Sequence, residues 1–199
     1  MIGMARRRIG TLIVLSASLA VAGCRASSAA HGLAGQPGSF CAVYFSPHGG
    51  CTEHIVKAIG NAKRSILVQA YSFTSQPIAE ALVEAQQRGV TVEVIVDKSQ
   101  LAERHSMMGT LLKAGVPVDI DASHAIAHNK VILIDGDTVL TGSFNFTDSA
   151  EERNAENLLQ VQDQTLAVQY AANWQKHRVH SSPYGEVLTS RGQRVRLGR

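Results

Sequence analysis

Between residues 41 and 177, short apolar segments alternate with longer amphipathic ones, and this alternation constrains the fold more than any other feature. Segments of strand length and strand composition occur at 41–45, 65–71, 90–96, 116–120 and 157–161. Helical patterns occupy 51–62, 77–88, 106–114 and 164–177. Such alternation predicts one α/β domain built on a mixed, largely parallel β-sheet flanked by helices.

A hairpin expected near residue 135 carries a set of polar side chains. His128 and Lys130 stand at the head of an apolar strand, where strand alternation places them on one face. A tight Asp-Gly turn then returns the chain to residues 142–145, in which Ser143 and Asn145 again share a face. We therefore expect an imidazole, an ammonium, a hydroxyl and a carboxamide to converge at neighbouring strand ends.

This combination of groups suits a phosphate. Lys130 supplies positive charge, Ser143 and Asn145 donate hydrogen bonds, and His128 is able to attack phosphorus or to move a proton. Gly142 is expected to leave room for a ligand to approach the backbone. Carboxylates are sparse within the cluster, which makes it a poor magnesium site. The residues therefore predict a reaction without metal or cofactor.

The spacing of these residues is that of a known motif. The spacing resembles the HKD signature of the phospholipase D superfamily. It consists of His128-x-Lys130, four further residues, Asp135, six further residues and then Gly-Ser-x-Asn at 142–145. The stretches "YFSP" (44–47), "AYSFTSQPIAEALVEAQQRGVTVEVIVD" (70–97), "TGSFNFT" (141–147) and "NAEN" (154–157) are similar to the small bacterial single-motif endonucleases of the Nuc type. The resemblance covers about residues 40–177.

The resemblance implies a role for each matching residue. His128 would be the nucleophile and form a phosphohistidine intermediate. Lys130 and Asn145 would hold the phosphate, with Ser143 as a further donor. Glu156, within "NAEN", would accept a hydrogen bond from the second ring nitrogen of His128 and so fix its tautomer.

Two further expectations concern the motif. Asp135 belongs to it, but its position at a strand end indicates a structural role. A single motif also leaves the reaction without a second acid/base, and the mature chain is too short for two such halves. We therefore expect a homodimer in which the His128 side chains of two subunits meet at a two-fold interface.

The sequence at both ends of the chain predicts segments that lie outside this domain. Residues 1–23 resemble a bacterial lipoprotein signal peptide that ends before Cys24, which implies lipidation of Cys24 and membrane attachment in the cell envelope. The alternative is an ordinary secretory signal, with a secreted product and Cys24 incidental. We expect a flexible tether at 24–39, the catalytic domain at 40–180 and a basic, disordered tail at 181–199.

The remaining cysteines, Cys41 and Cys51, permit two interpretations. In an oxidising compartment they would form a disulfide that closes a short loop. Alternatively, they are two unrelated, small buried residues. Neither has the neighbouring ligands of a metal site, and no metal site is expected elsewhere.

The charge distribution bears on the substrate. Of 19 basic and 16 acidic residues, three basic ones lie in the signal and four after residue 190. Residues 24–189 therefore hold 12 basic and 16 acidic residues, a balance of −4, so a broad basic face is not expected. The first hypothesis is a nonspecific endonuclease acting on DNA or RNA, and the second is a phospholipase D acting on phospholipid head groups. A third, an inert binding protein, fits poorly with an intact motif.

The aromatic residues and the remaining histidines have alternative roles. Tyr71 and Phe73 either stack on a base or belong to the core. Trp174 is expected to pack inside the protein. The histidines outside the motif are expected on the surface or in loops, with His124 a candidate for the mouth of the cleft.

Overall fold

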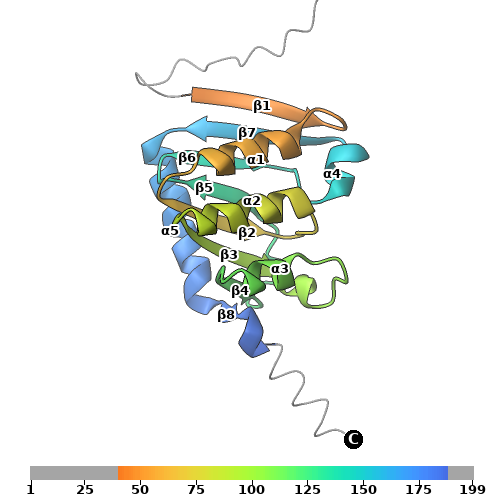
Figure 1. Cartoon of the computed structure of the whole chain (residues 1–199), viewed down its shortest axis with the longest axis vertical. Coiled ribbons are helices and arrows are strands. Elements are labelled where there is room, and N and C mark those ends of the chain that lie inside the picture. The colour runs from red at the N-terminus through yellow and green to blue at the C-terminus, as the bar shows by residue number, and fades with distance from the viewer. Residues whose placement is uncertain (1–39, 188–199) are drawn as a thin grey trace, which may run out of the picture.

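The computed structural model describes residues 40–187; the predicted signal peptide, Cys24, the tether and the residues after 187 lie outside this range. One eight-stranded sheet forms the centre, in the order β1-β7-β6-β5-β2-β3-β4-β8. Its strands are β1 (Phe40–Ser46), β2 (Ser65–Ala70), β3 (Thr91–Asp97), β4 (Val118–Asp121), β5 (Lys130–Ile134), β6 (Thr138–Gly142), β7 (Glu156–Gln162) and β8 (Ser182–Pro183). The sheet is mixed and flanked by helices in a single domain, as the sequence predicted (Figure 1).

The prediction that the sheet is largely parallel is wrong. Only β2–β3 and β3–β4 pair in parallel, and each of the other neighbours pairs antiparallel. The physical reason is the position of β1, which is not beside β2 but at the sheet edge, antiparallel to β7. Although β1 and β2 are consecutive strands joined by a helix, they are not neighbours in the sheet and so form no parallel pair.

Helices cover both faces of the sheet (Figure 1). The helices α1 (Cys51–Asn61), α2 (Gln76–Gln87) and α3 (Met108–Lys113) lie together on one face, and the long helix α5 (Gln164–His180) lies on the other. A 3₁₀ turn, η1 (Lys98–Leu101), and a short helix, α4 (Asp148–Glu152), complete the fold. Sequence patterns did not indicate these two short elements.

Each face of the sheet has its own hydrophobic core. The larger core lies under α1–α3 and includes Ile55, Leu82 and Phe73. The smaller one lies under α5 and includes Trp174, which is buried and donates from Nε1 to the Val68 carbonyl oxygen. Trp174 is thus a packing residue, as expected. In the described part of the chain, no helix combines the length and the apolar composition that a membrane span needs.

The domain continues beyond the expected boundary at residue 180. Ser182 and Pro183 pair with β4, and Tyr184 is buried against the larger core. The expectation of disorder is therefore wrong for residues 181–187. The reason is that a short antiparallel pairing and one aromatic anchor are enough to hold a polar segment.

Cys41 and Cys51 are both buried and both free. Cys51 begins α1 inside the larger core, whereas Cys41 lies on β1. The disulfide interpretation is not supported, and the alternative of two small buried residues matches the structure. Burial, together with the charge of Glu151, raises the pKa of the Cys51 thiol to about 11, which disfavours its thiolate form at neutral pH.

Candidate active site

The candidate site residues other than Asp135 gather at the ends of four neighbouring strands. The site lies where β2 and β6 end and where β5 and β7 begin, and these ends coincide because β5 and β7 run antiparallel to their neighbours. Lys130 begins β5 and pairs with Ala70 at the end of β2. Glu156 begins β7, two residues before Leu158, which pairs with Gly142 at the end of β6. Sheet topology therefore assembles groups that are up to 86 residues apart in the chain.

His128 precedes β5 and is exposed. Its imidazole lies against Tyr71, with ring centroids 4.6 Å apart and an interplanar angle of 54°. The Tyr71 N–H donates to the Asn129 carbonyl oxygen over 2.9 Å, which ties the segment of His128 to the end of β2. His128, the candidate nucleophile, is therefore exposed to solvent and packs on one side against the ring of Tyr71.

Lys130 is the buried cation of the site, with 7% of its surface exposed. Its Nζ donates to the backbone carbonyl oxygen of His128 over 2.7 Å and lies 5.1 Å from the centre of the Tyr71 ring. Burial lowers the pKa of Lys130, and the negative charge of Glu156 raises it in partial compensation. Within residues 40–187 no carboxylate forms an ion pair with this ammonium, so the site retains an unneutralised positive charge.

Ser143 is oriented by Asn157. Its Oγ accepts hydrogen bonds from the Asn157 backbone N–H (3.0 Å) and from Asn157 Nδ2 (3.3 Å). A hydroxyl oxygen has two lone pairs, and both are engaged here. The Ser143 O–H is therefore left to donate outward, as a phosphate ligand requires. Asn157 was not singled out from the sequence, although it is the last residue of "NAEN".

Gly142 has a different role from the one expected. It adopts φ 146°, and a Cβ at this position would lie 2.3 Å from the Asn157 carbonyl oxygen. That carbonyl accepts from the backbone N–H groups of Ser143 (3.1 Å) and Phe144 (3.2 Å). The glycine therefore makes room for the neighbouring strand and not for a ligand.

Asn145 projects from a segment anchored in the core. Phe144 and Phe146 on either side are buried, and Phe146 bridges to Phe73 alongside the chain that follows β2. Among the described residues, Asn145 Oδ1 is buried without a hydrogen-bond partner. Buried polar atoms are normally satisfied. Asn145 Oδ1 is thus open to a hydrogen-bond donor, whereas a phosphate oxygen would be bound by Nδ2 of the same carboxamide.

Glu156 lies near Lys130 but does not contact His128. Its Oε1 accepts from Asn154 Nδ2 over 3.1 Å, and its backbone N–H donates to Ser46 Oγ over 3.2 Å. The expected hydrogen bond between His128 and Glu156 is not formed among the described residues. What the structure shows is an electrostatic link, in which the carboxylate favours the charged form of Lys130.

Asp135 lies at the opposite end of β5 from Lys130. Its carboxylate accepts from the backbone N–H groups of Lys63 (2.8 Å), Arg64 (2.7 Å) and Ser65 (3.0 Å). It adopts φ 54° in the turn between β5 and β6. The residue fastens this turn to the start of β2, which agrees with the structural role expected for it.

A cleft of about 670 Å³ adjoins the site. Tyr71, Thr74, Asn145 and Met107 line it together with both acidic and basic side chains. Of the two aromatic candidates, Tyr71 lines this cleft, whereas Phe73 is fully buried in the core. The site is therefore open, with one aromatic wall and mixed charge.

Comparison with known proteins agrees with this geometry. The family described as "Cardiolipin synthase, PLD-like domain" matches residues 55–178. A protein of Rickettsia conorii named "Phospholipase D" is 48% identical over 130 residues, which are 65% of each chain. "Mitochondrial cardiolipin hydrolase" of Xenopus tropicalis is 36% identical over 58% of this chain and 55% of that one.

A solved structure extends the comparison to the fold. Nuc from Salmonella typhimurium, a phospholipase D family member, superposes with a TM-score of 0.71 at 37% identity, over 73% of this chain and 98% of that one. The protein therefore belongs to the phospholipase D superfamily of phosphodiester hydrolases. Within that superfamily, the chain belongs to the PLD-like domain family.

Proposed function

We propose that the protein hydrolyses phosphodiesters without a catalytic metal, through a covalent phosphohistidine at His128. The observation that carries this proposal is the buried ammonium of Lys130, which forms no ion pair with a carboxylate among the described residues. The ammonium and the exposed imidazole of His128 both lie against the ring of Tyr71. Burying an unpaired charge is costly. A bound phosphate would supply the missing negative charge.

The surrounding groups fit the proposed steps. His128 attacks phosphorus and the first alcohol leaves; water then cleaves the phosphohistidine and releases the phosphate group on the second fragment. Lys130 and the Ser143 hydroxyl stabilise negative charge on the non-bridging oxygens, and Asn145 Nδ2 joins them as a further donor. A second acid/base is required to protonate the leaving oxygen and to activate the water.

We propose that a second copy of the chain supplies this group, in a two-fold homodimer. Support comes from β1, where Val43 and Phe45 are 50% and 62% exposed. Tyr44 between them points toward α1, where it stacks on His54, so Val43 and Phe45 lie on the opposite face. Phe45 pairs with Asn157, the residue that orients Ser143. If a second copy covered this apolar face of β1, the interface would lie beside the strand ends that carry the site.

For the substrate we propose nucleic acid, cut as a nonspecific endonuclease acting on DNA or RNA. The domain has the extent of Nuc, 98% of which is covered, and its sequence resembles the Nuc-type endonucleases. Tyr71 is half-buried and lines the cleft beside His128, where a base could stack on its ring. A polymer that continues in both directions would require a cleft that is open to solvent, as this one is.

The second candidate is a phospholipase D activity on head groups at the cell envelope. Three observations favour it: the acidic balance of residues 24–189, the exposed Ile126 two residues before His128, and the names of the relatives from Rickettsia and Xenopus. The lipoprotein signal proposed for residues 1–23, with lipidation at Cys24, would hold the site at a membrane in either case.

One pair of proteins separates the candidates. Wild type and His128→Ala are incubated in EDTA with supercoiled plasmid, with single-stranded RNA and with vesicles of phosphatidylcholine and cardiolipin. The nuclease proposal predicts nicking by the wild type alone, which weakens steeply as salt is raised. Head-group release without nicking would favour the lipase. Equal activity of both proteins on every substrate would contradict the role of His128.

A further inference from the structure

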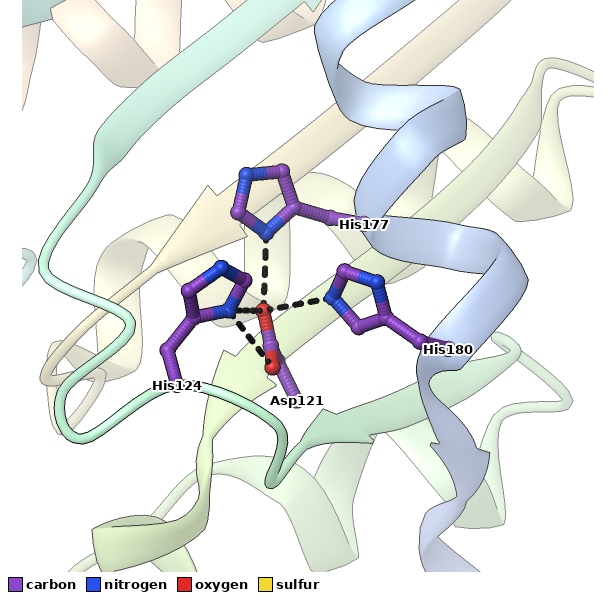
Figure 2. Close-up of side chains that lie close together, drawn as sticks. All are labelled: Asp121, His124, His177 and His180. Carbon is purple, nitrogen blue, oxygen red and sulfur yellow. Dashed lines mark hydrogen bonds and ion pairs between the residues drawn. The ribbon is translucent and has the colours of Figure 1, made fainter.

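Four side chains converge far from the phosphate site, at the end of β4 (Figure 2). Asp121 is the last residue of β4 and its side chain is fully buried. His124 lies in the loop that follows, and His177 and His180 lie one turn apart near the end of α5. Three imidazoles from two separate segments thus surround one carboxylate.

The distances among these groups are close to those between the ligands of one metal ion. Asp121 Oδ2 lies 2.8 Å from His177 Nδ1, 2.9 Å from His124 Nδ1 and 3.3 Å from His180 Nε2. One ligand atom from each residue fits within a group whose members are all within 4.8 Å of one another. In a tetrahedral zinc site, ligand atoms about 2.0–2.1 Å from the metal are about 3.3 Å apart. To reach that arrangement, the ring nitrogens would draw closer to one another and Oδ2 would withdraw slightly from the two Nδ1 atoms.

Asp121 Oδ2 faces three ring nitrogens, but His124 Nδ1 also lies 3.1 Å from Oδ1, so the lone pairs of the two carboxylate oxygens suffice for every donor in the cluster. Hydrogen bonding and metal binding therefore both fit these positions. What points to a cation is that three imidazoles from two segments each direct a ring nitrogen at one buried carboxylate. Oδ1 meanwhile accepts from the Ser123 backbone N–H over 3.1 Å, which would orient the carboxylate while Oδ2 binds.

The cluster offers a mixed donor set of three imidazoles and one carboxylate. Imidazole nitrogen together with carboxylate oxygen is a donor set that suits zinc and related transition metals.

The backbone around the cluster is fixed by other contacts. Ser182 pairs with Ile120, which holds the end of α5 beside the end of β4. Arg178, between the two helical histidines, forms an ion pair with Asp119 at 2.9 Å. Lys98 Nζ donates to the His124 carbonyl oxygen over 2.7 Å. The ligands are thus held in place by elements that do not depend on a metal.

We propose that Asp121, His124, His177 and His180 form a structural binding site for one divalent transition metal ion of the zinc class. Four protein ligands fill a tetrahedral shell and leave no position for substrate, so the site is structural. It would join β4, α5 and the loop of residues 122–129, which leads into His128. This loop is also held by Asp97 Oδ2, which accepts from the Ala127 N–H over 2.7 Å.

The sequence did not predict this site, and His124 had been considered only for the mouth of the cleft. The available signal was two short pairs, Asp121-x-x-His124 and His177-x-x-His180, which are 53 residues apart at their nearest ends. Each pair alone is unremarkable. Only the pairing of β4 with β8 brings the two together.

The test is direct metal binding by the full chain without a histidine tag. The protein is stripped with a chelator, exchanged into metal-free buffer and titrated with Zn²⁺, and bound metal is measured by mass spectrometry. Co²⁺ serves as a second probe, because tetrahedral Co²⁺ has an intense visible spectrum. His177→Gln and His180→Gln remove one ligand each, and His48→Gln is the control, since His48 is an exposed histidine paired with Glu152.

The proposal predicts about one Zn²⁺ per chain, a tetrahedral Co²⁺ spectrum and a melting temperature that rises with Zn²⁺. Each ligand variant should bind at least about tenfold more weakly, whereas His48→Gln should bind like the wild type. His180 is 34% exposed, so its variant should fold even if His177→Gln does not. No tight binding by the wild type, or unchanged binding by both ligand variants, would show a hydrogen-bonded cluster only. Neither readout depends on hydrolytic activity.

Discussion

Lys130 Nζ lies 2.7 Å from the backbone carbonyl oxygen of His128, so the charge that would hold the phosphate is fastened to the residue that would attack it. Lys130→Met keeps the length and apolar body of the side chain and removes the charge. We expect kcat/KM to fall by about 10²–10³-fold, because charge stabilisation in the transition state is lost. Stability should be unchanged or higher, since burial of an unpaired charge is relieved.

The control for this substitution is Lys57→Met, which removes an exposed lysine on α1. Its activity should match the wild type on a substrate too short to reach α1. Hydrolysis by Lys130→Met within a few-fold of the wild type would exclude Lys130 as the phosphate ligand.

Gly142→Ala should destabilise the fold. The new Cβ would lie 2.3 Å from the Asn157 carbonyl oxygen, in a backbone conformation with φ 146°. We expect a loss of about 2–4 kcal/mol in the free energy of unfolding, measured by urea denaturation. Gly109→Ala in α3 is the matched control, because a Cβ there meets nothing within 4 Å and alanine favours a helix. Equal stability of the two variants would refute the packing role of Gly142.

Asp135→Asn should affect stability and leave the chemistry intact. Partial burial raises the pKa of Asp135, but the backbone N–H groups of Ser65, Lys63 and Arg64 outweigh it and hold the pKa below its usual value of 3.8. The charged form therefore stabilises the fold at neutral pH, and this contribution is lost as pH falls below about 3.8 through the folded pKa. We expect a cost of about 1–2 kcal/mol at pH 7.

Denaturation at several pH values checks the sign of this effect. The gap between wild type and Asp135→Asn should shrink as pH drops below the ordinary pKa. Glu84→Gln, an exposed carboxylate on α2, should show no such gap. A gap that widens at low pH, or a large loss of kcat in Asp135→Asn, would contradict a purely structural role.

Phe45→Glu tests the proposed homodimer. A charge on the exposed apolar face of β1 should prevent a second copy from docking, so sedimentation should show a monomer with activity reduced by at least about tenfold. Val168→Glu, on an equally exposed valine of α5, should remain dimeric and active. A fully active monomer, of either the wild type or Phe45→Glu, would rule out a site shared between subunits.

Local sequence patterns predicted most of the helices and strands, but they did not predict which distant strands pair in the sheet. The expected helices and strands lie within about three residues of those observed. The position of β1 beside β7 depends on contacts between residues more than 100 apart, and no local pattern encodes it. For the same reason the sheet was expected to be largely parallel.

The site was predictable to the extent that it lies in one hairpin. The spacing of His128, Lys130, Ser143 and Asn145 identified the residues, and their strand ends meet at one edge as expected. The hydrogen bonds from Asn157 to Ser143 and the clash that Gly142 avoids both arise from β7, which pairs with β6 only in the folded chain. The histidine cluster around Asp121 was missed because two distant pairs must meet to form it.

The covalent role of His128 is tested most directly by trapping the intermediate. Wild type is mixed with excess phosphodiester, quenched at alkaline pH within one turnover, digested and examined by mass spectrometry. We expect a phosphoryl adduct that retains one substrate fragment, on the peptide that contains His128, and its absence from His128→Ala. Rapid turnover with an adduct on another residue, or with no adduct at any time, would contradict the proposed mechanism.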